Sequence, residues 1–138
     1  MREIKFRGQR IDNGKWVYGY LFYDFDCTDK YAPFINWKDN RYLGGIGEEE
    51  IEEEGIGQYT GLKDKNGKEI YEGDIVKVND EIIAKVIWDK DYLGYFLYAN
   101  EENSIDSFEN GEQPLYDYFG SIEVIGNIYE NPELLKEE

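Results

Sequence analysis

Residues 75–98 read IVKVNDEIIAKVIWDKDYLGYFLY, and this stretch decides the fold class. Between its turns, apolar side chains recur at every second position, which is the period of a β-strand with one buried face. The expected core face of the middle segment holds Ile82, Ala84, Val86 and Trp88. Asn79-Asp80 and Asp89-Lys90-Asp91 are typical turn sequences. The stretch therefore predicts a meander of three strands.

Toward the N-terminus the pattern predicts a further hairpin. Residues 4–7 alternate, residues 16–23 are apolar on both faces, and Asp12-Asn13-Gly14 separates the two segments as a turn. Residues 33–37 read as a candidate strand. By contrast, residues 48–54 read EEEIEEE, and such a run of like charge favours a solvated mobile loop or a single helical turn.

Toward the C-terminus, strands alternate with turn signals. Asn66-Gly67 is suited to a tight turn, and we expect Asp74, next to Gly73, to accept backbone N–H bonds that fix the next turn. Residues 99–114 predict a long polar loop, and residues 122–128 a last strand. Asn131-Pro132-Glu133 then has the pattern of a helix start, with Asn131 as the N-cap.

Taken together, these segments predict an all-β protein of small bent sheets, with an SH3-like barrel in the C-terminal part and a short C-terminal helix. β-branched and aromatic residues outnumber Ala, Leu and Met, which agrees with strands rather than helices. The length of 138 residues suits one domain. We expect a single domain over 1–138, composed of an N-terminal hairpin with a variable acidic segment (1–57) and an SH3-like β part (58–138).

Composition excludes several functional classes. With 15 Lys+Arg against 31 Asp+Glu, the net charge of −16 argues against direct contact with nucleic-acid backbone. The chain has no His and a single Cys, Cys27, so His-based metal sites, Ser-His or Cys-His nucleophile pairs and an internal disulfide are all excluded. Asp64-Lys65-Asn66-Gly67 is similar to part of an EF-hand calcium loop, but it lacks a third oxygen ligand before Gly67, and Gly73 stands six residues after Gly67, where the loop needs Glu. We expect no cofactor and no metal.

The chain also lacks the apolar segments that secretion or membrane insertion requires. Its N-terminus has no stretch suited to a signal peptide, and no apolar run reaches roughly 18 residues. We expect a cytoplasmic protein without membrane contact.

The stretch QYTGLKDKNGKEIYEGDIV at residues 58–76 resembles the YopX family of phage and prophage proteins. The opening REIKFR at residues 2–7 and IGNIYENPELL at residues 125–135 are similar to the same family, so the resemblance frames nearly the whole chain. It implies a small, mainly β protein encoded by a phage or prophage and located in the bacterial host cytoplasm. The family has no established biochemical activity.

The aromatic residues are the candidate binding residues. Tyrosines are placed on several predicted strands, where an apolar ring with a polar tip suits a protein interface. We name Tyr59, Tyr92, Tyr95 and Tyr98 as a protein-binding set. A second interpretation, in which these rings only cover the sheet surface through cross-strand pairs, stays open.

The sequence therefore favours a non-enzymatic, acidic β module that binds another protein, either a basic host protein or a second copy of itself as a homo-oligomer. The alternative is a nucleic-acid mimic, in which the charge of −16 occupies the basic groove of a host DNA-binding protein. A third class, an enzyme using only carboxylates, Tyr or Lys, would require a cleft with converging carboxylates. Salt dependence of partner capture separates the first two.

Overall fold

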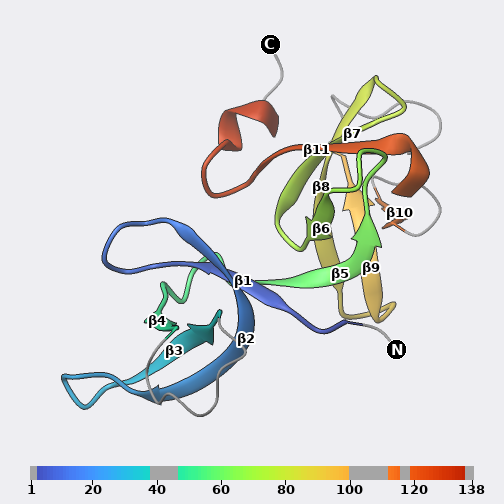
Figure 1. The fold of residues 1–138 in the computed structure, drawn as a ribbon. Coiled ribbons are helices and arrows are strands. Elements are labelled where there is room, and N and C mark those ends of the chain that lie inside the picture. Colours follow the sequence, from blue (N-terminus) through green and yellow to red (C-terminus); the bar gives the residue numbers. More distant parts are fainter. Residues whose placement is uncertain (1–2, 38–46, 100–111, 116–118, 136–138) are drawn as a thin grey trace. The chain divides into compact units, whose positions relative to one another are not determined.

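The structure is a computed structural model that describes residues 3–37, 47–99, 112–115 and 119–135 (Figure 1). The chain divides into two compact units, Met1–Tyr59 and Thr60–Glu138. Both units consist mainly of antiparallel strands, so the predicted all-β class is confirmed.

Unit 1 is a sheet built around the predicted N-terminal hairpin. Its strands are β1 (Phe6–Gln9), β2 (Trp16–Phe25), β3 (Tyr31–Asn36), β4 (Glu48–Glu50) and the beginning of β5 (Gly57–Lys63), in the order β4-β3-β2-β1-β5. Strands β1 and β2 pair with Phe6 opposite Gly19, and β2 and β3 pair with Tyr20 opposite Asn36. Both the hairpin and the strand expected near residues 33–37 are confirmed.

The acidic segment departs from its expected structure. Residues 48–50 form strand β4, which pairs with β3, and the next residue, Ile51, is buried and bridges to Arg10. A solvated loop or helical turn was therefore the wrong prediction for this part. Burial of Ile51 holds the segment in place, and Arg10 forms an ion pair with Glu49 at 3.2 Å, which offsets part of the repulsion among the carboxylates.

Unit 2 contains the predicted meander. It continues β5 and adds β6 (Glu69–Tyr71), β7 (Asp74–Val78), β8 (Ile82–Asp89), β9 (Gly94–Tyr98), β10 (Glu112–Pro114) and β11 (Ile122–Asn127), with 3₁₀ turns η3 (Phe119–Ser121) and η4 (Pro132–Leu135). One sheet has the order β10-β9-β8-β7-β11. Ile82, Ala84 and Val86 lie in its core as predicted, whereas Trp88 is 45% exposed.

Three finer expectations differ from the structure. The described strands form no closed barrel, because β11 returns to pair with β7 and leaves β10 and β11 at the two edges of an open order. The expected C-terminal helix is the four-residue 3₁₀ turn η4. The long loop expected up to Pro114 ends in strand β10, which pairs with β9; residues 100–111 lie outside the described part.

Buried polar side chains fix the turns that frame this sheet. Asp74, which is buried at the start of β7, accepts the Tyr71 N–H at 2.8 Å, as the sequence predicted. Near the C-terminus, Asn131 Oδ1 accepts the Asn127 N–H at 3.2 Å rather than capping a helix, and a Cβ atom at Gly126 would lie only 2.6 Å from that oxygen. Glycine at position 126 therefore leaves the Asn131 side chain room to make this hydrogen bond.

Asp64 has the largest structural role among these groups. Its side chain is 7% exposed and accepts the N–H groups of Asn66, Lys68 and Val124 at 2.8–2.9 Å. Burial by itself raises the pKa of Asp64, but the three backbone N–H bonds outweigh it and the pKa lies below its ordinary value. The carboxylate is therefore held ionised at neutral pH.

Candidate functional site

The structure separates the tyrosines that the sequence grouped on β9. Tyr95 packs against the hydrophobic core of unit 2 and meets the Trp88 ring edge-on, with ring centroids 5.0 Å apart. Tyr98, three positions along the strand, lies on the opposite face with Lys85 Nζ 5.4 Å from its ring. A partner that covers one of these two rings therefore does not meet the other on the same sheet face.

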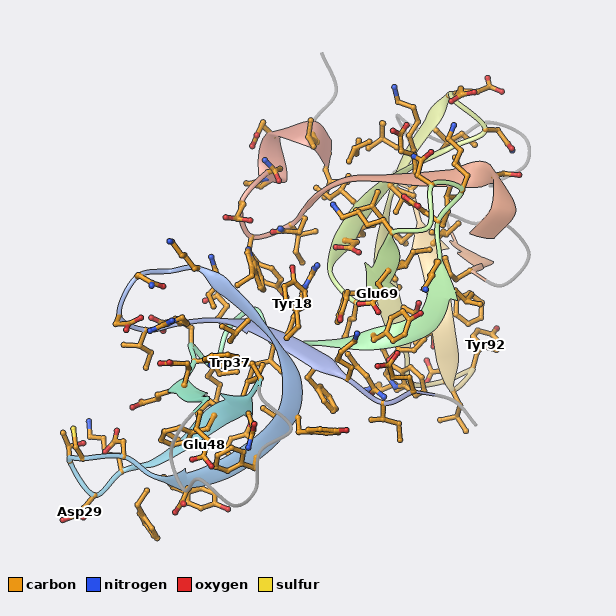
Figure 2. The ribbon with its side chains drawn as sticks, viewed as in Figure 1. Tyr18, Asp29, Trp37, Glu48, Glu69 and Tyr92 are labelled. Atoms are coloured by element: carbon orange, nitrogen blue, oxygen red, sulfur yellow. The ribbon has the colours of Figure 1, made fainter. Side chains whose placement is uncertain are left out.

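The remaining two tyrosines have different surroundings. Tyr92 lies in the β8–β9 turn, 74% exposed, and its side chain extends outward from that turn (Figure 2). Its ring lies 5.6 Å from that of Phe96. Tyr59 belongs to unit 1 and is only 6% exposed, with Lys5 Nζ 5.5 Å from its ring. Among the four, Tyr92 and Tyr98 are exposed, Tyr95 is half-buried and Tyr59 is buried.

A larger set of exposed rings occurs on β2, on β3 and directly after β3 in unit 1. It consists of Tyr18, Tyr20, Tyr23, Phe25, Tyr31 and Trp37. Where β2 ends and β3 begins, the rings of Tyr23 and Tyr31 stack with their centroids 5.7 Å apart. The ring of Phe25 meets that of Tyr31 edge-on, with centroids 5.5 Å apart. Because side chains alternate along β2, Tyr18 and Tyr20 lie on one face of the strand, and Tyr23 and Phe25 lie on the other. Exposed aromatic rings on a sheet are typical of interaction surfaces.

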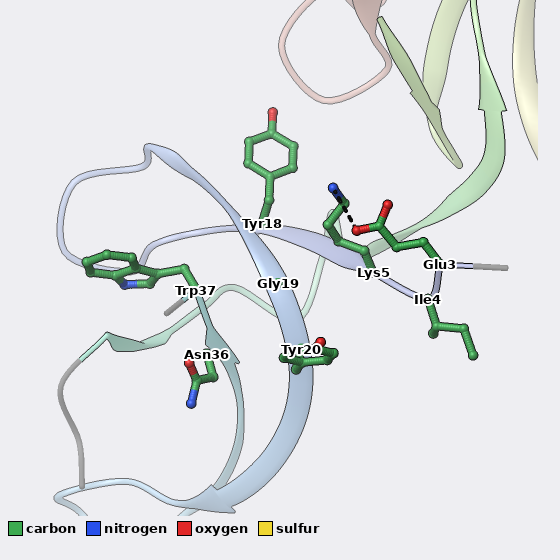
Figure 3. A pocket seen from close by; sticks show the side chains of 8 residues that line it. All are labelled: Glu3, Ile4, Lys5, Tyr18, Gly19, Tyr20, Asn36 and Trp37. Carbon is green, nitrogen blue, oxygen red and sulfur yellow. Dashed lines mark ion pairs between the residues drawn. The ribbon is translucent and has the colours of Figure 1, made fainter. Parts of the chain in front are cut away.

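The surface around Gly19, next to Tyr18 and Tyr20, is hollowed. We call it the Gly19 hollow; it has a volume of about 300 Å³ and is lined by Glu3, Ile4, Lys5, Tyr18, Gly19, Tyr20, Asn36 and Trp37. Figure 3 shows Glu3, Ile4 and Lys5 on one side of β2, and Asn36 and Trp37 on the other. Tyr18 and Tyr20 flank the glycine along the strand.

Gly19 lines the hollow at a position where no larger residue fits. A Cβ atom at this position would collide with the backbone oxygen of Asn36 and lie 2.9 Å from its carbonyl carbon. It would also lie 3.0 Å from Trp37 Cα. The glycine thus lets the end of β3 approach β2 closely, which sets Asn36 and Trp37 beside the two tyrosines.

The hollow combines one ion pair with one buried amide oxygen. Glu3 and Lys5 form an ion pair with a separation of 3.5 Å between carboxylate oxygen and ammonium nitrogen. Asn36 Oδ1 is buried and has no hydrogen-bond partner among the described residues. A buried amide oxygen without a donor is unfavourable by itself, so a ligand that supplies an N–H group would gain free energy there.

For catalysis, the hollow offers the Glu3 carboxylate, the Lys5 amine and two phenols. Across the part of the chain that the structure describes, three or more His, Cys, Asp or Glu side chains are nowhere grouped as metal ligands. None of the described helices has the length and apolar character needed to cross a membrane.

Sequence reasoning placed Tyr18 and Tyr20 on a strand but missed the hollow. One local signal was present, namely a glycine between two tyrosines inside an apolar run, which indicates a bend or a close backbone approach. Asn36 carried no such signal. Its environment arises from pairing between β2 and β3, and from the approach of the segment before β1, which no single stretch of sequence displays.

Comparisons with known proteins agree with this architecture. The family model described as YopX protein matches residues 5–136. Three solved chains match, among them the crystal structure of protein EF1440 from Enterococcus faecalis. That protein is 27% identical, the match covers 99% of this chain and 100% of that one, and the TM-score is 0.55. No curated protein matches significantly.

Proposed function

The chain belongs to the YopX family, and we propose that it is a non-enzymatic, acidic phage or prophage protein whose function is to bind another protein. The observation that carries this proposal is the set of exposed aromatic rings on unit 1. Burying such rings in a complex removes a large apolar area from water, which is why Tyr and Trp are enriched among interface hot spots.

Charge and composition support the same proposal. A net charge of −16 favours a partner with a basic surface, because complementary potentials accelerate association and select among partners. The absence of His from the sequence removes the usual general base near neutral pH. Binding rather than turnover is therefore the function that these residues suit.

The test is an affinity purification with the full chain as bait from host cytoplasm, followed by mass-spectrometric identification of the retained proteins. A bait with Phe25→Ser and Tyr31→Ser serves as the aromatic variant, and Leu93→Ser, an exposed apolar residue of unit 2, serves as the matched control. We expect loss of partner with the double variant and retention with the control. Sedimentation of the purified chain tests self-association in parallel, and a monomer that retains no protein contradicts the proposal.

A second candidate, nucleic-acid mimicry, is favoured by the same charge of −16. A mimic would retain DNA-binding proteins, and its complexes would dissociate steeply between about 0.1 M and about 0.5 M salt because exposed charges are screened over that range. Association through aromatic rings would persist at the higher salt concentration. Repeating the purification at both concentrations therefore separates the two candidates.

A further inference from the structure

We infer that the Gly19 hollow binds the side chain of an arginine on a basic protein partner. This inference rests on the proposed function of protein binding and names the chemistry of one contact within it. It is carried by three properties of the hollow: its aromatic walls, its buried amide oxygen and the charge around it.

The walls suit a flat cation. Tyr18, Tyr20 and Trp37 each leave about half of their surface exposed, between 43% and 58%, around a space of about 300 Å³. A space of this size accommodates one long side chain rather than a whole cofactor. A guanidinium group is planar and stacks on aromatic faces, where its attraction to the ring quadrupole adds to the apolar contact.

The buried oxygen calls for a hydrogen-bond donor. Asn36 belongs to the lining of the hollow, and its buried Oδ1 has no partner among the residues that the structure describes. Arginine carries five N–H donors in a rigid fork, so one donor meets this oxygen once the Asn36 amide turns toward the hollow, while the plane of the group rests on a ring. An apolar side chain would fill the space but leave the oxygen unsatisfied.

The charge around the hollow favours a cation over an anion. Among the described residues that line the hollow, Lys5 alone is cationic, and its ammonium lies 3.5 Å from the Glu3 carboxylate, which offsets its charge. The chain as a whole carries −16. A nucleotide base would also stack on these rings, but its phosphate would be repelled by that net charge.

The experiment titrates the full-length ¹⁵N-labelled chain with three capped tripeptide amides, Gly-Arg-Gly, Gly-Lys-Gly and Gly-citrulline-Gly, followed by NMR. Citrulline keeps the shape of arginine but has no charge, and lysine keeps the charge without the planar fork. We expect saturable shifts of the Gly19 amide, the Asn36 side-chain amide and the Trp37 indole with the arginine peptide. Binding of the other two peptides should be at least about 3-fold weaker, as the loss of a stacked, charge-assisted contact implies.

Two substitutions of Asn36 should act in opposite directions. Asn36→Leu removes the acceptor and should weaken binding of the arginine peptide about 5- to 10-fold, whereas Asn36→Asp keeps an acceptor, adds a negative charge and should tighten it. Tyr20→Ser, which removes one exposed wall, should weaken binding without affecting the acceptor. Tyr92→Ser, an exposed ring of unit 2, is the matched control and should leave binding unchanged.

Shifts that spread over the acidic surface, or equal affinities for the arginine and lysine peptides, would overturn the inference, because general attraction to a charge of −16 predicts both. So would an Asn36→Leu variant that keeps its dispersed spectrum and full affinity. The proposed function fails separately: if Asn36→Leu and Tyr20→Ser still retain the partner in the affinity purification, protein binding stands and only its assignment to this hollow is lost.

Discussion

Asp64 Oδ2 accepts the backbone N–H of Val124 at 2.9 Å, across 60 positions of the sequence. The other oxygen of the same carboxylate accepts the N–H groups of Asn66 and Lys68, at 2.8 and 2.9 Å. One buried side chain therefore closes the Asn66-Gly67 turn and fastens it to β11. This relationship gives a physical role to part of the stretch that resembles the YopX family.

Removing this carboxylate should destabilise unit 2 strongly. Asp64→Ala leaves three N–H groups without their acceptor, and we expect the free energy of unfolding to fall by about 2–4 kcal/mol. Urea denaturation of the full chain measures the loss. Asp91→Ala is the control, because Asp91 is an exposed residue of the β8–β9 turn, so its loss should stay within about 0.5 kcal/mol. Equal effects of the two variants would contradict the assigned role.

The same group predicts a pH dependence of stability. The pKa of Asp64 is lowered in the folded chain, so the unfolded chain, with a pKa near 3.8, takes up the proton first as the pH falls. The stabilising contribution is therefore fully present above about pH 4 and is lost progressively below it, toward the folded pKa. We expect the difference in unfolding free energy between the native chain and Asp64→Asn to be constant from pH 7 to about pH 4 and to shrink at lower pH. A difference that stays constant down to pH 2 would argue against an ionised Asp64 as the source.

Glycine at position 19 should be irreplaceable even by alanine. Because an added Cβ would meet the backbone of Asn36 and Trp37 rather than a movable side chain, we expect Gly19→Ala to cost about 2 kcal/mol or more and to abolish arginine-peptide binding. Gly120→Ala is the matched control, since nothing lies within 4 Å of a Cβ there, and it should be nearly neutral. Denaturation and amide spectra of both variants measure the contrast. A Gly19→Ala chain as stable as the control would show that β2 and β3 are not this close.

Tyr95 and Tyr98 should respond differently to the same substitution. Tyr95→Ser removes a ring that packs against the core and against Trp88, so we expect a loss of about 1–3 kcal/mol. Tyr98→Ser removes a partly exposed ring and a contact with Lys85, and the loss should be below about 1 kcal/mol. Thermal unfolding of the two single variants makes the comparison. Equal destabilisation would mean that both rings lie on one buried face.

The sequence pattern correctly predicted strands and turns that depend on residues close together in the chain. The alternation in residues 82–88 identified three of the four residues on its core face correctly, and Asn79-Asp80 turns the chain with positive φ at both positions. Trp88 failed because it lies near the strand end, where it remains exposed against Tyr95.

Nonlocal pairing explains what the sequence could not show. Strand β4 was not predicted because its run of glutamates is typical of a solvated segment. Its structure depends on pairing with β3 and on the burial of Ile51, which the local sequence does not show. Neither segment alone indicates that β11 pairs with β7. With this pairing the described strands form an open sheet, where we expected an SH3-like barrel. In the Gly19 hollow, the tyrosines could be placed on a strand, but Asn36 and Lys5 join them only through strand pairing and chain approach.

The return of β11 to β7 has a consequence for how the protein is made. Strands β8, β9 and β10 all precede β11 in the chain, so one side of β7 keeps its backbone groups unpaired until the last strand folds back onto it. An unpaired strand edge of this kind is a template for pairing with a strand of another chain. Pairing of β11 therefore protects this edge of β7, and a chain truncated before residue 122 should aggregate.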